Sequence, residues 1–437
     1  MKERAPLAGA YFLDEMVSAQ KQGAASGICS ICSANPTVLR AAVRHALEHA
    51  IPLLIESTSN QVNQFGGYTG QVPTQFSRTV VEMAERAGLP SNRLILGGDH
   101  LGPNPWQKEP AEAAMVKARK LVADCVRAGY LKIHLDASMS LGGDPPDSPA
   151  GEVSAGRAAA LCQASESTWQ KLGGRSPAPR YIIGTEVPPP GGEVGVAARV
   201  QATSVSSARQ TLELTRAAFH KVGLDAAWER VIGLVVQPGV EFGDRTIHPY
   251  QHARAADLAW FIERVPGIIY EAHSTDYQSP RALRELVRDH FAILKVGPAL
   301  TFAFREAMFA LENIEIELFT GSTADQRSHL QDTIEAEMLT HPEHWQRYYP
   351  GAPAEQRLMR RFSLSDRIRY YWPRPAVQAA QERLLANLSQ AAIPPGLANQ
   401  FFPDEVDLSG DPPAPDDLIY RRIRRVLEDY RAACIPA

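Results

Sequence analysis

Eight short runs rich in Ile, Val and Leu recur through the first 300 residues, and longer segments with helical character separate them. The runs cover residues 27–34, 51–58, 93–100, 130–137, 181–187, 231–238, 267–274 and 291–298. Successive runs begin 24 to 51 residues apart, which leaves room for the crossover helix that two parallel strands require. The pattern therefore predicts eight strands, each followed by a helix.

The first crossover shows how a strand passes into a helix. Asn35 follows the first run, and asparagine is a favourable helix N-cap. Pro36 suits the first helical position. Apolar residues then recur at helical spacing, at Val38, Leu39, Ala42, Val43 and Ala46. We expect a helix here.

Polar residues concentrate at the C-terminal ends of the runs. They are Ser33, Asn35, Glu56, Asp99, His100, His134, Asp136, Glu186, Gln237, Glu271 and His273. In a closed (β/α)8 barrel these ends converge on one rim, where barrel enzymes carry out their chemistry. A doubly wound open sheet has the same alternation of elements but would scatter the polar ends along a crevice. The sequence therefore favours a TIM barrel over residues 1–300.

Residues 301–437 contain no further series of strand-like runs. Segments 303–318 and 376–388 have helical character, and Pro and Gly interrupt the chain between and after them. We expect a helical C-terminal extension packed on the barrel. A Gly- and Pro-rich stretch at 142–151 is typical of an insertion, which would lie beside the fourth strand.

The composition excludes several classes of partner. Among 437 residues, 45 Lys and Arg nearly balance 49 Asp and Glu, so the chain carries no excess positive charge for nucleic acid. It has no apolar stretch of the length that spans a membrane, and its N-terminus lacks the apolar core of a signal peptide. Five irregularly spaced cysteines do not form a disulfide framework. We expect a cytoplasmic protein that binds neither nucleic acid nor membranes.

Imidazole and carboxylate groups at strand ends are the usual ligands of a divalent metal. His100 and His273 both end apolar runs beside acidic residues and are the best nitrogen ligands, with Glu186 as an oxygen donor. The alternative is that each makes ordinary hydrogen bonds at the rim. Asp99 and His100 are adjacent and would face opposite sides of a regular strand. They converge only if the strand ends there, which the glycines around them permit.

Other residues carry weaker signals. Pairs two residues apart share a strand face, so one member of His134–Asp136 and of Glu271–His273 can orient the other. The spacing of Cys29 and Cys32 indicates buried packing rather than a redox pair. Lys295, in an apolar run, is more consistent with a rim lysine than with a Schiff base.

One group of histidines and two nucleotide-binding motifs are set aside. The histidines in helical or loop segments, such as His45 and His49, are expected to be solvated. No GxxxxGK[ST] phosphate loop and no GxGxxG motif after a strand are present, which argues against a kinase or a nicotinamide enzyme.

Several strings are specific enough to indicate a family. GICSICSANP, LGGDHLGPNPW, KIHLDASMS, IGTEVPPPGGE, YEAHSTDYQ and SLSDRIRYYWP closely resemble the tagatose-1,6-bisphosphate aldolase Z-subunit family, from about residue 27 to 431. The resemblance implies one of two roles. Some members act as 4-epimerases of tagatose- and fructose-type ketohexoses or their phosphates. Others are non-catalytic partners that stabilise a class II aldolase subunit.

A fainter similarity to the metal-dependent class II aldolases implies roles for single residues. Asp99 and His100 resemble the proton-transfer acid and a zinc ligand of those enzymes, and His273 with the three residues after it resembles a second ligand and phosphate contacts. One imidazole is missing, because Gln237 stands where those aldolases have a His-Gly ligand. Gln237, Glu186 or Glu241 would have to fill that position.

The expected reaction inverts C4 of a ketohexose by retro-aldol cleavage of C3–C4 and recombination on the other face of the aldehyde. This route needs an electrophile and a base near the C4 oxygen. We assign a divalent metal, zinc first and Mn, Co or Ni otherwise, to His100, His273, Glu186 and Gln237. We assign catalysis to Asp99, Asp136 and Glu186.

The remaining site residues are expected to bind the substrate. Hydroxyl groups and a terminal phosphate would be held by Asn60, Gln61, Gln64, His134, Ser274, Thr275, Asp276, Thr301 and Arg367. The sequence leaves open whether the ketohexose is phosphorylated. A partner aldolase subunit and assembly as a homo-oligomer are the expected interactions.

Overall fold

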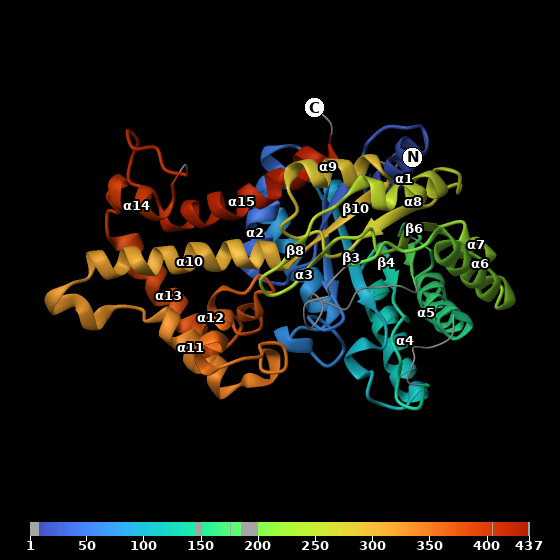
Figure 1. Ribbon diagram of the computed structural model, residues 1–437, viewed down its shortest axis with the longest axis horizontal. Helices are drawn as coiled ribbons and strands as arrows, with labels where there is room; N and C mark the ends of the chain where they lie inside the picture. The colour runs from blue at the N-terminus through green and yellow to red at the C-terminus, as the bar shows by residue number, and fades with distance from the viewer. Residues whose placement is uncertain (1–7, 146–150, 175, 185–199, 404, 436–437) are drawn as a thin grey trace.

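Eight parallel strands close a barrel in the computed structural model, which describes residues 8–145, 151–174, 176–184, 200–403 and 405–435 (Figure 1). The barrel strands are β1 (Ile28–Ile31), β2 (Leu53–Thr58), β3 (Leu94–Leu101), β4 (Lys132–Leu135), β5 (Arg180–Ile183), β6 (Val231–Val235), β9 (Ile269–Ala272) and β10 (Phe291–Val296). They follow this order around the barrel, and β10 pairs with β1 to close it. The predicted TIM barrel is confirmed, and each predicted run overlaps one strand, with β3 and β5 extending one residue beyond their runs.

Helices form the outer layer of the barrel. They are α2 (Pro36–Glu48), α3 (Pro73–Ala87), α4 (Ala111–Arg127), α5 (Gly151–Lys171), α6 (Val205–Lys221), α8 (His252–Glu263), α9 (Pro280–Arg288) and α10 (Pro298–Leu318). The predicted cap of α2 is confirmed, because Asn35 Oδ1 accepts hydrogen bonds from the amides of Thr37 at 2.9 Å and Val38 at 3.2 Å. A two-stranded hairpin, β7 (Glu241–Phe242) with β8 (Ile247–His248), lies outside the barrel sheet.

Side chains inside the barrel form layers from an apolar floor to a polar mouth. An apolar cluster fills the floor, where Leu13, Met16 and Val17 of α1 (Ala8–Lys21) pack against barrel residues that include Leu54 and Ile269. Alternate residues of a strand share a face. Glu56 therefore follows Leu54 into the interior, and Glu271 and then His273 follow Ile269. All three polar residues are buried.

The C-terminal extension is helical, as predicted. It contains α11 (Leu330–Thr340), α12 (Pro353–Phe362), the 3-10 turn η6 (Arg367–Tyr370), α13 (Pro375–Gln390), α14 (Pro395–Phe401) and α15 (Pro415–Cys434). Figure 1 shows α10 projecting from the barrel and α15 running back beside it. Cys434 accepts a hydrogen bond from the Gly27 amide at 2.8 Å, which ties α15 to the chain before β1. The predicted domain boundary at residue 300 stays a prediction, and α10 spans it.

Several smaller expectations concern single segments. All five cysteines are free. No helix in the described part of the chain is long and apolar enough to cross a membrane. Of the predicted insertion at 142–151, residues 146–150 lie outside the described residues. Its first residue, Gly142, forms a bridge with Pro110.

An irregularity at the end of β3 brings two adjacent side chains to the mouth. The register with β4 shifts between Gly98 and Leu101, and His100 has a φ of 47°. A left-handed residue breaks the alternation of a strand. Asp99 and His100 can therefore both line the same pocket. On a regular strand, two adjacent side chains would face opposite sides.

The close approach of Gly102 to β4 provides a test of this arrangement. A Cβ atom on Gly102 would lie 1.7 Å from the Asp136 carbonyl oxygen. We expect Gly102→Ala to push the two strand ends apart and to lower the free energy of unfolding by several kcal/mol. Gly156→Ala is the control, because this helical glycine is exposed with no atom near its Cβ position. It should raise stability by about 0.5 to 1 kcal/mol. Urea denaturation measures both, and a neutral Gly102→Ala variant would contradict the packing.

Candidate active site

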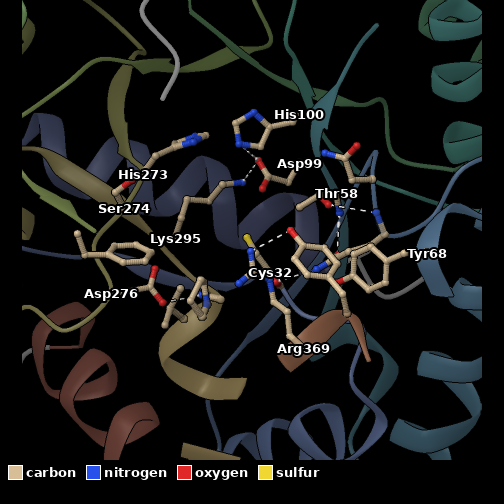
Figure 2. A pocket seen from close by; sticks show the side chains of 17 residues that line it. Cys32, Thr58, Tyr68, Asp99, His100, His273, Ser274, Asp276, Lys295 and Arg369 are labelled. Atoms are coloured by element: carbon tan, nitrogen blue, oxygen red, sulfur yellow. Dashed lines mark hydrogen bonds and ion pairs between the residues drawn. The ribbon is translucent and has the colours of Figure 1, made fainter. Parts of the chain in front are cut away.

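A pocket opens at the carboxyl ends of the barrel strands, as the polar strand ends predict. Its volume is about 650 Å³ when counted out to the open mouth. Strand ends supply one side of the wall, and η6 of the extension supplies another. Figure 2 shows His100, Asp99 and His273 at one end of the pocket, with Lys295 and Cys32 nearer its centre. The extension therefore helps to build the pocket.

Three buried imidazole rings form a triangle at one end of this region. The ring centre of His100 lies 4.9 Å from that of His273 and 5.2 Å from that of His134. His134 and His273 are also 5.2 Å apart. The rings come from β3, from β4 and from the residue after β9. The structure thus places a third imidazole, that of His134, beside the two that the sequence predicts as ligands.

Each ring is oriented by a hydrogen-bonding neighbour. His100 Nδ1 lies 2.7 Å from Asp136 Oδ2, and His273 Nε2 lies 3.0 Å from Glu271 Oε1. The Glu271–His273 pairing agrees with the prediction, whereas Asp136 orients His100 rather than its expected partner His134. His134 Nδ1 lies 3.2 Å from the His100 amide, and its Nε2 is buried without a hydrogen-bond partner.

A network of buried ion pairs supports the imidazoles from below. Lys132 Nζ lies 2.6 Å from Glu56 Oε1 and 2.5 Å from Glu271 Oε2. Lys295 Nζ lies 2.6 Å from Glu56 Oε2 and 2.6 Å from Asp99 Oδ1. Lys295 Nζ also lies 3.4 Å from Glu271 Oε1. Each lysine thus joins carboxylates on different strands. The Lys295 side chain lines the pocket at the strand ends, where the sequence interpretation places it, and it is 5% exposed and paired with carboxylates.

The network fixes the charge states of its members. Burial alone would raise the pKa of Asp99, but His100 and Lys295 outweigh it and hold that pKa well below its usual range. Burial also opposes ionisation of Glu271, and the two lysines lower its pKa in spite of it. Burial lowers the pKa of His273 to about 3, so this ring is neutral. Asp136 and Asp99 raise the pKa of His100 against the effect of burial.

The residues present suit a divalent cation. Ligand atoms of Asp99, His134, Glu271 and His273 all lie within 4.8 Å of one another. Two of these groups are acids, and with Glu56 and Asp136 four buried carboxylates face only the two lysines in this cluster. If the imidazoles are neutral, two negative charges remain, which a divalent cation would balance. Within this group, His134 Nε2 has no hydrogen-bond partner, so this nitrogen is open to a cation once it gives up its proton.

The four carboxylates are those of Glu56, Asp99, Asp136 and Glu271, and each of these residues is less than 5% exposed. Each carboxylate oxygen of Glu56 pairs with one of the two lysines. Glu56 is therefore the least suited of the four to bind a cation.

The structure brings many of the predicted site residues together. Those that line the pocket are Asn60, Gln61, Asp99, His100, His273, Ser274 and Asp276. His134 and Asp136 contact this group through His100. The two Asp276 hydrogen bonds to backbone amides lower its pKa, but burial is stronger and raises it to about 6.

Other predicted residues lie apart from the pocket lining. Gln64 donates to the Lys117 carbonyl, and Thr275 donates to that of Lys295 at 2.5 Å. Gln237 Oε1 accepts from two backbone amides of its own turn, both at 2.9 Å.

Thr301 and Arg367 are also engaged elsewhere. Thr301 lines a neighbouring cavity and donates to Asp366 Oδ2 at 2.5 Å. The Arg367 guanidinium lies 3.1 Å from the centre of the Tyr348 ring, in an outer groove. Glu186 lies outside the described residues.

Sequence reasoning missed several residues of the site. Lys132 and Glu56 complete the ion-pair network, and Cys32, Tyr68 and Arg369 line the pocket. Lys132 carried a usable signal, because a lysine within an apolar strand must find a buried partner. Arg369 carried none, because the sequence does not show which residues of an extension reach the barrel.

A second cluster of histidines corrects the expectation that they are solvated. His45 is 3% exposed, and its Nε2 lies 3.2 Å from Glu428 Oε2 on α15. His49 Nε2 lies 3.4 Å from the same oxygen. Glu428 is also bound by Arg431. This cluster joins α2 to α15 and lies away from the barrel mouth.

Known proteins resemble this chain over nearly its whole length. The family model described as D-tagatose-1,6-bisphosphate aldolase subunit GatZ/KbaZ-like matches residues 13–435. The D-tagatose-1,6-bisphosphate aldolase subunit GatZ of Salmonella gallinarum is 49% identical over 428 residues, 97% of this chain and 99% of the relative. GatZ of Klebsiella pneumoniae is 50% identical over 425 residues with the same coverage.

A solved structure is also similar. It is described as a probable tagatose 6 phosphate kinase from Sinorhizobium meliloti and has a TM-score of 0.83 and 44% sequence identity. The match covers 93% of this chain and 100% of that chain.

The ion-pair network makes a prediction about stability. Lys132→Met removes a fully buried cation and leaves Glu56 and Glu271 short of one counter-charge. We expect the free energy of unfolding to fall by about 3 to 5 kcal/mol. Lys120→Met is the control, because Lys120 is 60% exposed and pairs with Asp124 on the surface. It should change stability by less than about 1 kcal/mol. Equal effects of the two variants in urea denaturation would contradict the role of the network.

Proposed function

Because this chain belongs to the family of GatZ/KbaZ-like D-tagatose-1,6-bisphosphate aldolase subunits, we propose that it is the Z-type subunit of such an aldolase and stabilises a catalytic class II partner. The observation that carries this proposal is the similarity to named GatZ subunits, at 49 to 50% identity over 97% of the chain. A match of that extent covers the barrel and the extension alike.

A second candidate function is catalysis by this barrel itself, as a C4 epimerase of a ketohexose or its phosphate. The buried polar mouth favours it. Replacing a buried ion pair by apolar residues is often neutral or stabilising, so a scaffold gains little from the two lysines and four carboxylates inside this barrel. Three imidazoles with oriented nitrogens above that network are the materials of a catalytic site.

The proposed reaction needs a cation site and a base, and different side chains would supply them. A divalent cation, zinc first, held by His100, His134 and His273 with Asp99 beside them would polarise the ketose carbonyl group. Of the two candidate bases, Asp99 lines the pocket, whereas Asp136 is engaged by His100 and by Ser138 at 2.8 Å. Asp99 is therefore the proposed acceptor of the C4 hydroxyl proton.

The rest of the pocket would keep the two fragments in place while the aldehyde turns. Asn60 and Gln61 lie on its wall and offer amide groups to sugar hydroxyls. The Gln61 amide is itself fixed, because its Nε2 donates to the Cys32 carbonyl at 3.2 Å. Enclosure of this kind favours recombination over loss of a fragment.

The kinase description of the Sinorhizobium structure finds no support in the sequence of this chain. The sequence has neither a GxxxxGK[ST] phosphate loop nor a GxGxxG motif after a strand. Neither of those nucleotide-binding signals therefore supports phosphoryl transfer.

One set of assays separates the two functions. The purified chain is incubated alone with fructose, tagatose and their 6-phosphates, and it is also added to a class II tagatose-bisphosphate aldolase subunit whose half-life of activity is measured. As a stabilising subunit, the chain should yield no epimer and should prolong the partner's activity. As an epimerase, it should form product alone, lose this activity to a chelator and regain it with Zn, Mn, Co or Ni.

Asp99→Asn is the matched variant for these assays. It is isosteric and removes the proposed base, so it should lower epimerisation by about 100-fold or more and leave any effect on the partner intact. A fully active metal-free protein would contradict the metal-dependent mechanism. A chain that forms no product and leaves the partner's half-life unchanged would contradict both functions.

A further inference from the structure

We propose that Arg369, supplied by the C-terminal extension, binds the phosphate group of a phosphorylated ketohexose in the barrel pocket. The inference deepens the second function above and rests on its premise that the barrel binds a ketohexose. It assigns a substrate class, sugar phosphates rather than free sugars, to a pocket for which the sequence leaves this choice open.

Arg369 is positioned to contact a substrate in the barrel pocket. Arg369 belongs to η6 and lines the same pocket as Asp99 and His273. Figure 2 shows it well separated from the imidazoles, with Lys295 and Cys32 lying between. The pocket therefore has two ends of different chemistry. One offers imidazoles and carboxylates to the reacting carbons, and the other offers a guanidinium to a remote group of the substrate.

The guanidinium of Arg369 has no carboxylate partner among the described residues. Its hydrogen bonds go to the carbonyl groups of Ser365 and Asp366 and, at 3.0 Å, to the Tyr370 hydroxyl. In the described part of the chain, no carboxylate oxygen forms an ion pair with it within 4.0 Å. Arg369 is partly buried. A cation that is partly removed from water is stabilised by a counter-charge, and a phosphate dianion supplies one in a geometry that arginine favours.

Neighbouring arginines of the extension differ in this respect. Arg305 pairs with Asp366 at 3.4 Å, and Arg374 pairs with Glu343 at 3.3 Å. The charges of these two are compensated within the protein.

Another common anion site of such barrels is already filled in this protein. TIM barrels frequently bind phosphate near the last strands at a helix N-terminus. Here Asp276 Oδ1 accepts hydrogen bonds from the Gly297 amide at 3.0 Å and the Ala299 amide at 2.7 Å, at the start of α10. The protein's own carboxylate thus occupies these donors, and the guanidinium of Arg369 remains the available group for an anion.

Calorimetry on the zinc-loaded full chain tests the assignment. The titrants are tagatose 6-phosphate, fructose 6-phosphate, free tagatose and inorganic phosphate. We expect the wild-type protein to bind the sugar phosphates more tightly than free tagatose. Arg369→Gln should weaken binding of the sugar phosphates by roughly 10- to 100-fold and leave the affinity for free tagatose within about 2-fold. Arg369→Lys keeps the positive charge and loses the bidentate hydrogen bonding of the guanidinium. Its affinity for the sugar phosphates should lie between those of the wild type and Arg369→Gln.

Two further variants make the test specific. Arg374→Gln removes a charge from the outer groove and should leave all four affinities unchanged. Arg367→Gln examines the residue to which the sequence assigns the phosphate, and a loss there with none at Arg369→Gln would overturn the proposal. Equal losses for free and phosphorylated sugars, or equal affinity of the wild type for both, would also overturn it.

Binding and turnover are read out separately. Sugar-phosphate binding that depends on Arg369, in a chain that forms no epimer, would support the subsite and contradict only the catalytic function. If Arg369→Gln unfolds, Arg369→Lys carries the comparison, since it retains a cation at the same place.

Discussion

The buried lysines of the barrel interior are the constraint on which the site depends. Lys132 and Lys295 each join carboxylates from different strands, and Glu56 contacts both. Without them, Glu271 and Asp99 would face each other across a dry interior as unbalanced anions. With them, Glu271 stays ionised and orients His273, and Asp99 stays ionised at the mouth. The chemistry at the rim thus rests on charge balance one layer below it.

The fold followed from the sequence because its signals are local and repeated. Period-two alternation within short runs, and a cap such as Asn35, act over a few residues and need no knowledge of the tertiary structure. The proximity of polar strand ends such as Asp99 and His273 could be predicted, because the carboxyl ends of all the strands of a parallel barrel lie at one face. The left-handed conformation of His100 was permitted by its glycine neighbours but could not be deduced from them.

The rest of the site depends on contacts between distant parts of the chain. The sequence gives no reason why Asp136 should orient His100 rather than His134, since that choice depends on how β3 and β4 meet. Arg367 and Arg369 stand two residues apart in one motif, yet one stacks on Tyr348 in the outer groove and the other lines the pocket. Only the packing of η6 against the barrel distinguishes them.

The proposed cation site lies among the three imidazoles of His100, His134 and His273. Diffraction from zinc-grown crystals, recorded above and below the zinc absorption edge, tests it most directly. The account predicts one anomalous peak within bonding distance, about 2.0 to 2.1 Å, of nitrogens from His100, His134 and His273. Zinc bound only elsewhere, for instance between His45, His49 and Glu428, with no peak at the barrel mouth would contradict it.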